Sequence, residues 1–313
     1  MSLLNRPYFH DETAAYAYLE RVLWPNGPTC PHCGNADATK IGALKGTSTR
    51  PGLKKCYECR KQFTVKVGTV YESSHIPLHK WLQATYLMCT SKKGISAHQM
   101  HRVLEITYKS AWFMAHRIRE AMRANKLPPM GGEGKTVEID ETYVGGKERN
   151  KHKSKRDPKN IGGVGKAMVL ALVERNGHVR SQHLASVNQR NLRDILTAQL
   201  KRGTAVMTDE AGQYRQVGRD FAHQAVNHGI GEYVRGDAHT NTIEGYFSIL
   251  KRGVNGTYHH VSQQHLKRYL AEFDFRYNLR SALGVEDVER TDKALAGIVG
   301  KRLRYRDSSS AAE

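Results

Sequence analysis

The chain has 313 residues, of which 39% are hydrophobic, and it carries a formal net charge of +19 at pH 7. This length allows two or three domains, each with its own core. The sequence contains no run of about 18 apolar residues and no apolar secretory segment, so we expect a cytoplasmic protein with no membrane partner. The excess of Lys and Arg favours a polyanionic partner such as nucleic acid, although a basic but otherwise ordinary enzyme has the same charge.

The N-terminal region combines a predicted helix, over about residues 11–23, with two closely spaced cysteine pairs. The pairs lie in "CPHCG" and "CYECRKQF" and comprise four of the five cysteines: Cys30, Cys33, Cys56 and Cys59. Four thiolates at this spacing predict one structural Zn²⁺ in a closed tetrahedral site, with "GALKGTSTRPG" as a long hairpin loop between the pairs. Redox-active dithiols are the alternative, but no thioredoxin-like βαβ pattern surrounds either pair. The fifth cysteine, Cys89, lies on an apolar helical face and is expected to be buried.

Residues 94–122 are predicted to form two helices separated by a short turn at "EIT". Ser96 is suited to cap the first helix, and three of its apolar residues are predicted to form its inner face: Met100, Val103 and Leu104. The pattern is typical of a helix-turn-helix, in which the second helix meets base edges, and an ordinary helical hairpin is the alternative. The basic charge favours DNA binding. The candidate DNA contacts on the second helix are Lys109, Ser110 and Arg119.

From residue 136 the pattern changes to strands alternating with helices. Three strand candidates follow one another in "TVEIDETYVGG", "AMVLALVERNG" and "HVRSQHLAS". A helix in "NLRDILTAQLKR" leads to a fourth strand in "TAVMTDE", and after a further helix "QAVNH" is a candidate fifth strand. Helices follow as far as Arg280. The order β-β-β-α-β-α-β-α matches a ribonuclease-H-like α/β fold.

A strongly basic segment lies between the first two of these strands. Residues 147–159 hold seven Lys or Arg residues. A solvated, mobile loop would have the same composition, but such segments also become ordered on a phosphate backbone. The predicted DNA contacts in this segment are Lys147, Lys151, Lys153, Lys155 and Arg156.

Three acidic residues are candidates for a shared metal site. Asp140 ends the first apolar strand run, Asp209 ends the fourth, and Glu244 lies on a helix that begins near Thr240 or Asn241. Taken singly, each is best explained as a surface acid. Taken together on this fold, they predict ligands for Mg²⁺, which prefers hard oxygen atoms, and two such ions support phosphodiester cleavage.

The motifs together resemble the DDE-class transposases of bacterial insertion sequences, specifically the ISXO2-like group with an N-terminal zinc ribbon. The resemblance covers nearly the whole chain and rests on "CPHCG…CYECRKQF", "KGISAHQMHRVLEITYKSAWFMAHRIREAM", "EIDETYVGGKERNKH", "VMTDE", "NTIEGYFSILKRGVNGTYHHVS" and "HLKRYLAEFDFRYN". It implies four parts: residues 1–75 with the N-terminal helix and zinc ribbon, 76–130 with the helix-turn-helix, 131–285 with the ribonuclease-H-like catalytic domain, and 286–313 with a C-terminal helix and basic tail.

The resemblance also implies which residues are catalytic. Asp140, Asp209 and Glu244 would hold two Mg²⁺ or Mn²⁺ ions; some relatives have Asn at the third position, where this chain has Glu. Lys251 would act near the scissile phosphate from the helix face that carries Glu244, with Arg252 as a further DNA contact, although a solvated lysine is the alternative. Two other acids of the same strand, Glu138 and Glu141, are weaker candidates for the place of Asp140.

The implied activity is that of a DNA transposase. It would bind the terminal inverted repeats of its element as at least a dimer, cut the 3′ ends with metal-activated water and join them to target DNA in a bacterial, nucleoid-associated setting. Two alternatives stay open: an element-derived DNA-binding regulator without catalysis, against which the intact acidic set argues, and a structure-specific nuclease.

Overall fold

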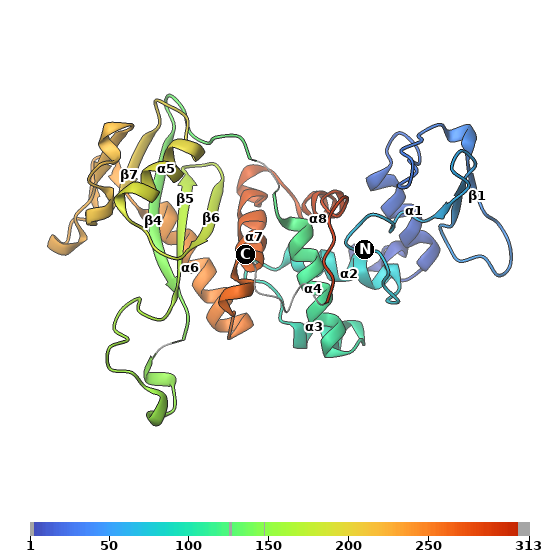
Figure 1. Cartoon of the computed structure of the whole chain (residues 1–313), viewed down its shortest axis with the longest axis horizontal. Helices are drawn as coiled ribbons and strands as arrows, with labels where there is room; N and C mark the ends of the chain where they lie inside the picture. The colour runs from blue at the N-terminus through green and yellow to red at the C-terminus, as the bar shows by residue number, and fades with distance from the viewer. Residues whose placement is uncertain (1–2, 125–126, 147, 306–313) are drawn as a thin grey trace. The chain divides into compact units, whose positions relative to one another are not determined.

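The computed structural model describes residues 3–124, 127–146 and 148–305, and it divides into two compact units. Unit 1 comprises Met1–Arg123 and Val285–Glu313, and unit 2 comprises Ala124–Gly284 (Figure 1). Lys147 and the last part of the basic tail lie outside the described residues. In the described part of the chain, no helix combines the length and the apolar character needed to cross a membrane.

Unit 1 begins with the predicted helix and the cysteine-rich segment. Helix α1 (Glu12–Leu23) is capped by Asp11, whose side chain accepts a hydrogen bond from the N–H of Ala14, which confirms the predicted start. A small antiparallel sheet follows, formed by β1 (Ile41–Ala43), β2 (Lys54–Cys56) and β3 (Gln62–Phe63). The connection between β1 and β2 is the long hairpin loop expected between the cysteine pairs.

The rest of unit 1 is helical. It contains α2 (Leu78–Thr90), α3 (Ala97–Leu104), α4 (Tyr108–Met122) and α8 (Asp287–Ala296), and α8 contacts α1, α2 and α4. Ser96 caps α3 as predicted, and Met100, Leu104 and Cys89 are buried as predicted. Val103 is 55% exposed, so its assignment to the inner face is wrong. The physical reason is that only the stripe through Met100 and Leu104, four residues apart, faces the neighbouring helices.

Unit 2 is a mixed α/β structure built on a five-stranded sheet in the order β6-β5-β4-β7-β8 (Figure 1). The strands are β4 (Thr136–Val144), β5 (Ala167–Glu174), β6 (Val179–Leu184), β7 (Ala205–Thr208) and β8 (Ala222–Ala225). β4, β5 and β6 form an antiparallel meander, whereas β7 pairs in parallel with both β4 and β8. The central strand β4 therefore reaches the same edge of the sheet as the carboxyl end of β7.

Helices cover both faces of this sheet. On one face, α5 (Gln189–Gln199) packs Leu192 and Leu196 against Val137 and Ile139 of β4. On the other face, α6 (Asn241–Gly253) and α7 (Gln263–Asn278) pack against the apolar residues of β5. Because side chains alternate along β4, Glu138 and Asp140 face α6 rather than α5. This alternation decides which acids lie beside α6.

The segment between β7 and β8 differs from the prediction. Instead of a helix it forms two short 3₁₀ turns, Gly212–Tyr214 and Val217–Arg219, and β8 begins two residues earlier than expected. Gly212 and Gly218 each lower helix propensity, which favours short turns over one continuous helix. A further hairpin, β9 (Val234–Arg235) with β10 (Ala238–His239), precedes α6 and was not predicted.

Candidate active site and metal centre

Two acidic residues follow neighbouring parallel strands of unit 2. Asp209 comes directly after β7, while β4 continues past Glu138, its last residue paired with β7, and carries Asp140 two residues further. The two strands run in the same direction, so both acids lie at the same edge of the sheet. Burial is the main cause that raises the pKa of Asp140, and the charge of Asp209 is the next. The two carboxylates are therefore electrostatic neighbours.

A cleft of about 660 Å³ joins this edge to α6. Its lining includes Asp140 from β4 and Glu244, Lys251 and Arg252 from α6. Glu244 and Lys251 are seven residues apart, which is two helical turns, so both lie on the helix face opposite the core. The structure thus brings four of the predicted residues to one cleft. Asp209 is next to the cleft rather than in its lining.

Glu244 has contacts that the sequence did not indicate. The hydroxyl of Thr240 donates a hydrogen bond of 3.0 Å to its Oε1 atom, and Nε2 of His228 lies 3.8 Å from the same oxygen. Both contacts hold the carboxylate at the first turn of α6. Thr240 and His228 both belong to the segment between β8 and α6. No sequence pattern, such as the apolar run that predicts a strand, indicates how this segment folds.

Carboxylate oxygens are the ligands that Mg²⁺ prefers, so the donor chemistry of this edge fits a divalent cation. Burial raises the pKa of Asp209 and of Glu141, and burial with neighbouring charges raises the pKa of Asp140 to about 7. Among the described residues, no three of these acids bring their oxygens within 4.8 Å of one another. For Asp140 and Glu141, part of the rise in pKa comes from the charges of neighbouring carboxylates, and a bound cation would offset this repulsion.

We expect the metal-free protein to lose stability as the pH rises, because of Asp140. Its folded pKa, about 7, lies above its ordinary value of 3.8, so its contribution to the free energy of unfolding is complete below about pH 4 and is lost as the pH rises through 7. Urea denaturation at pH 5 and pH 8, without added Mg²⁺, measures this. Asp140→Asn should show a smaller decrease than the wild type; an equal decrease would contradict the assigned pKa.

Glu138 has a structural role that excludes it as a replacement for Asp140. Its side chain is 0% exposed and accepts hydrogen bonds from Nε of Arg175 (2.7 Å), the hydroxyl of Thr242 (2.9 Å) and the N–H of Ile243 (2.9 Å). The last two donors belong to the first turn of α6, where a negative charge is favourable. Glu138 therefore ties α6 to β4 and fixes the position of Glu244.

Replacing Glu138 by alanine should destabilise unit 2 by about 3–5 kcal/mol, because it leaves Arg175 without its buried carboxylate and α6 without its N-terminal acceptor. The free energy of unfolding from urea titration is the measurement. Arg193→Gln is a matched control, since Arg193 forms its ion pair with Asp220 at the surface of the same unit, and it should have a much smaller effect. Equal effects of the two substitutions would contradict the structural role of Glu138.

Glu141 lies in the cleft although it is on the opposite strand face from Asp140. It lines the cleft and accepts hydrogen bonds from the amide of Gln213 and the hydroxyl of Tyr214. Both donors come from the 3₁₀ turn after β7. From its sequence pattern this residue is a weaker candidate than Asp140, and the turn that holds it in place was not predicted.

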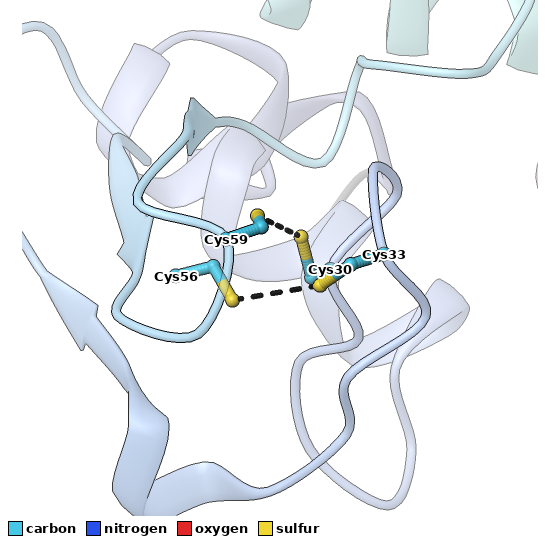
Figure 2. A group of neighbouring side chains, drawn as sticks. All are labelled: Cys30, Cys33, Cys56 and Cys59. Carbon is cyan, nitrogen blue, oxygen red and sulfur yellow. Dashed lines mark hydrogen bonds between the residues drawn. The ribbon is translucent and has the colours of Figure 1, made fainter.

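The four cysteines of unit 1 form a compact group (Figure 2). All four Sγ atoms lie within 4.8 Å of one another, and the pairs Cys30–Cys59 and Cys33–Cys56 are each 3.7 Å apart. Four sulfurs at the usual Zn–S distance of about 2.3 Å around a tetrahedral ion would be about 3.8 Å apart. The arrangement therefore fits one Zn²⁺ and is too wide for a disulfide bond.

Local backbone groups favour the thiolate form of Cys56. Hydrogen bonds from the N–H groups of Cys59 and Glu58 lower the pKa of Cys56 to about 6, and the side chain of Asn35 also donates to its sulfur. Thiolates, not thiols, are the metal ligands. The second cysteine knuckle is thus folded to present a charged sulfur to a metal ion.

The predicted DNA contacts on α4 differ in accessibility. Lys109 is exposed, with its Nζ atom 4.7 Å from the ring centre of Tyr305, and the hydroxyl of Ser110 accepts a hydrogen bond from Thr107 at the helix start. Arg119 is only 2% exposed, so it does not fit the predicted contact. A base contact needs an accessible side chain, and Arg119 lies on the buried side of α4.

The basic segment between β4 and β5 leaves most of its cations accessible. Lys151, Lys153, Lys155 and Arg156 are all exposed. Within the segment, Lys151 forms an ion pair of 2.7 Å with Glu148, and Arg156 donates to two backbone carbonyls. The four residues remain candidates for phosphate contacts.

Comparison with known protein families identifies two matching regions. Residues 131–278 match the family described as the ISXO2-like transposase domain, and residues 10–62 match the transposase zinc-ribbon domain. The first region contains the acidic cleft and the second contains the four cysteines. The cysteine group and the zinc-ribbon match together support a structural Zn²⁺.

Two individual proteins are also similar to the chain. An uncharacterized protein in the transposable element ISH50 of Halobacterium salinarum is 29% identical over 279 residues, which cover 86% of this chain and 91% of that protein. The crystal structure of the Mos1 strand transfer complex is similar over 68% of this chain and 72% of that one, with 12% identity and a TM-score of 0.27. This TM-score is too low to support an argument about the fold.

Proposed function

Since residues 131–278 match the ISXO2-like transposase domain and residues 10–62 match the transposase zinc-ribbon domain, we propose that the chain is a transposase that cuts the ends of its own element and joins them to target DNA. The observation that carries this proposal is the acidic cleft. Asp140, Glu244 and Lys251 line this cleft, and the charge of Asp209 contributes to the raised pKa of Asp140. Clustered carboxylates that bind divalent metal ions are one established means of catalysing in-line cleavage of a phosphodiester.

In the proposed site, Asp140, Asp209 and Glu244 hold two Mg²⁺ or Mn²⁺ ions. Bound ions of this kind stabilise developing charge on phosphate oxygens and lower the pKa of water. Lys251 and Arg252, on the same side of the cleft as Glu244, orient the phosphate by charge. In-line phosphoryl transfer depends on positioning and charge stabilisation, so no protein nucleophile is needed.

The architecture of both units supports the same proposal. An antiparallel three-strand meander followed by parallel strands, with helices on both faces, is the arrangement expected of a ribonuclease-H-like catalytic domain. The pair α3 and α4, with Lys109 exposed at the start of α4, is suited to a helix-turn-helix that reads the terminal repeat. An element has two ends, so we infer that at least a dimer assembles on them.

The test is cleavage of DNA that ends in the inverted repeats bracketing the gene. Purified full-length protein with Mg²⁺ should cut the 3′ strand at the repeat border and should leave a fragment with shuffled ends intact. Specific binding without cleavage would favour the regulator, and cleavage that follows DNA shape rather than the repeat sequence would favour a structure-specific nuclease.

A further inference from the structure

A second cleft of about 510 Å³ adjoins the acidic one, and Lys251 and Asn255 line both. It extends from α6 toward the end of β4 and the start of β5. Its other polar lining comes from both sides: Arg149, Asn150, Lys166, His259 and His260. Among the described residues that line it, none is acidic. The charge of the lining therefore reverses from one cleft to the next.

The cations of this second cleft are available to a ligand. Neither Arg149 nor Lys251 forms an ion pair with a carboxylate among the described residues, whereas Lys151 in the same segment does. Lys166 donates one hydrogen bond, to the carbonyl of Gly162 at 2.6 Å, which leaves its other N–H groups free of backbone partners in the described structure. Unpaired cations around a cleft create a field that attracts an anion such as a phosphate.

An aromatic side chain forms part of the wall. Tyr143 lines the cleft and is 41% exposed, and its ring rests on the backbone of Gly163 so closely that a Cβ atom there would be 2.4 Å from it. Contact with Gly163 thus limits the movement of the ring, while part of the side chain stays exposed. A fixed, exposed ring beside phosphate-binding cations is the usual platform on which an unpaired base stacks.

The backbone at the rim is strained. A π-helical turn (Val254–Tyr258) follows α6, and His259 then adopts φ 59° and ψ −43° with a hydrogen bond of 2.6 Å from the N–H of His260 to the carbonyl of Tyr258. This is the rare classic γ-turn. Such conformations persist where the surrounding structure imposes them, often at binding sites. Here the turn brings both imidazoles to the cleft.

We propose that the second cleft binds an unpaired segment of the DNA strand that carries the scissile phosphate. The volume of the cleft corresponds to a cube about 8 Å on a side. A DNA duplex is wider than its own major groove, which is about 12 Å wide, so a duplex does not fit inside the cleft. Phosphate oxygens lie against Arg149, Lys166 and Lys251, and a base stacks on Tyr143. Lys251 lines both clefts, so the strand passes directly to the acidic residues. This inference rests on the proposed function.

The test measures the affinity of the full-length protein for a short fluorescent oligothymidylate, without divalent metal, and for a duplex of the same length. Tyr143→Leu should weaken binding of the single strand by roughly 5- to 100-fold. Tyr143→Phe should bind it as tightly as the wild type, since stacking needs the ring alone. Arg149→Gln should make single-strand affinity less dependent on salt. The slope of log affinity against log salt concentration, which is negative, should decrease in magnitude by about 0.7. Duplex affinity should not respond to Tyr143→Leu.

Two matched controls lie outside the cleft in the same unit. Tyr233 and Arg202 are exposed, and neither lines the cleft, so Tyr233→Leu and Arg202→Gln should leave single-strand affinity unchanged.

A cross-linking experiment tests the position of the base directly. A 5-iodouracil placed in the oligonucleotide should cross-link to Tyr143 on irradiation. Equal effects of the Tyr143 and Tyr233 substitutions, or cross-links that all map elsewhere, would overturn the proposal. Because these assays need no metal, their outcome does not depend on whether the protein cuts repeat ends.

Discussion

Replacing Asp140 by asparagine is expected to reduce the rate of cleavage at a terminal repeat by about 10³-fold or more. The amide removes one anionic metal ligand from the cleft, and the several kcal/mol that a bound metal contributes to the transition state correspond to a factor of this size. Asp209→Asn and Glu244→Gln should have comparable effects. Binding of repeat DNA should survive in all three variants, because the carboxylates are proposed to hold metal and not DNA.

Two further substitutions make this prediction specific. Glu210→Gln is the matched control: Glu210 is adjacent to Asp209 but exposed, and it accepts hydrogen bonds from the backbone of His228 and Gly229. It should retain cleavage. Lys251→Gln should slow cleavage while Mn²⁺ binding, measured by calorimetry, is retained. If Glu210→Gln abolishes cleavage and Asp209→Asn does not, the metal site must be reassigned.

Replacing Cys56 by serine should remove the zinc and unfold the ribbon between α1 and α2. Closed zinc sites supply folding free energy directly, about 10–16 kcal/mol of apparent binding energy in zinc-finger peptides, and this small sheet has little apolar core of its own. We expect metal analysis to fall from one zinc per chain to none. Limited proteolysis should then cleave within residues 30–66 and spare unit 2.

Cys89→Ala is the control for the zinc prediction. Cys89 is buried in α2 and does not belong to the four-cysteine group, so its replacement should leave the zinc content at one per chain. Loss of zinc from this variant, or a Cys56→Ser protein that keeps its zinc and its resistance to protease, would contradict the assigned site.

The parts of the site that could be predicted are those with a local sequence signal. Two thiolates separated by two residues form half of a metal site within one turn, so the ligands can be recognised before the fold is known. Asp140 and Asp209 each follow an apolar run on parallel strands, which predicts that they lie at one edge, although β4 continues past Asp140 to Val144. The mixed α/β character of unit 2 follows from the same apolar periodicity.

The parts that could not be predicted depend on which distant groups meet. Glu138 and Asp140 lie on the same face of β4, so the strand pattern does not distinguish them. Only the hydrogen bonds that Glu138 accepts from Arg175 and from the first turn of α6 show that Glu138 is structural. Arg119 was predicted as a DNA contact on the second helix of the helix-turn-helix candidate, but it is buried, because burial is set by the packing of the whole helix. The second cleft combines Tyr143 with the γ-turn at His259, and neither has a sequence pattern.

The central claim is that one acidic site both cuts the element and joins it to a target. Joining of pre-cut repeat ends to a supercoiled plasmid, in the presence of Mg²⁺, tests it most directly when wild-type protein is compared with Asp209→Asn. We predict that the wild type produces joined products whose junctions begin at the repeat border, and that Asp209→Asn binds the same ends but forms none. Joining by Asp209→Asn at the wild-type rate, or a wild type that cuts repeat ends and never joins them, would contradict the account.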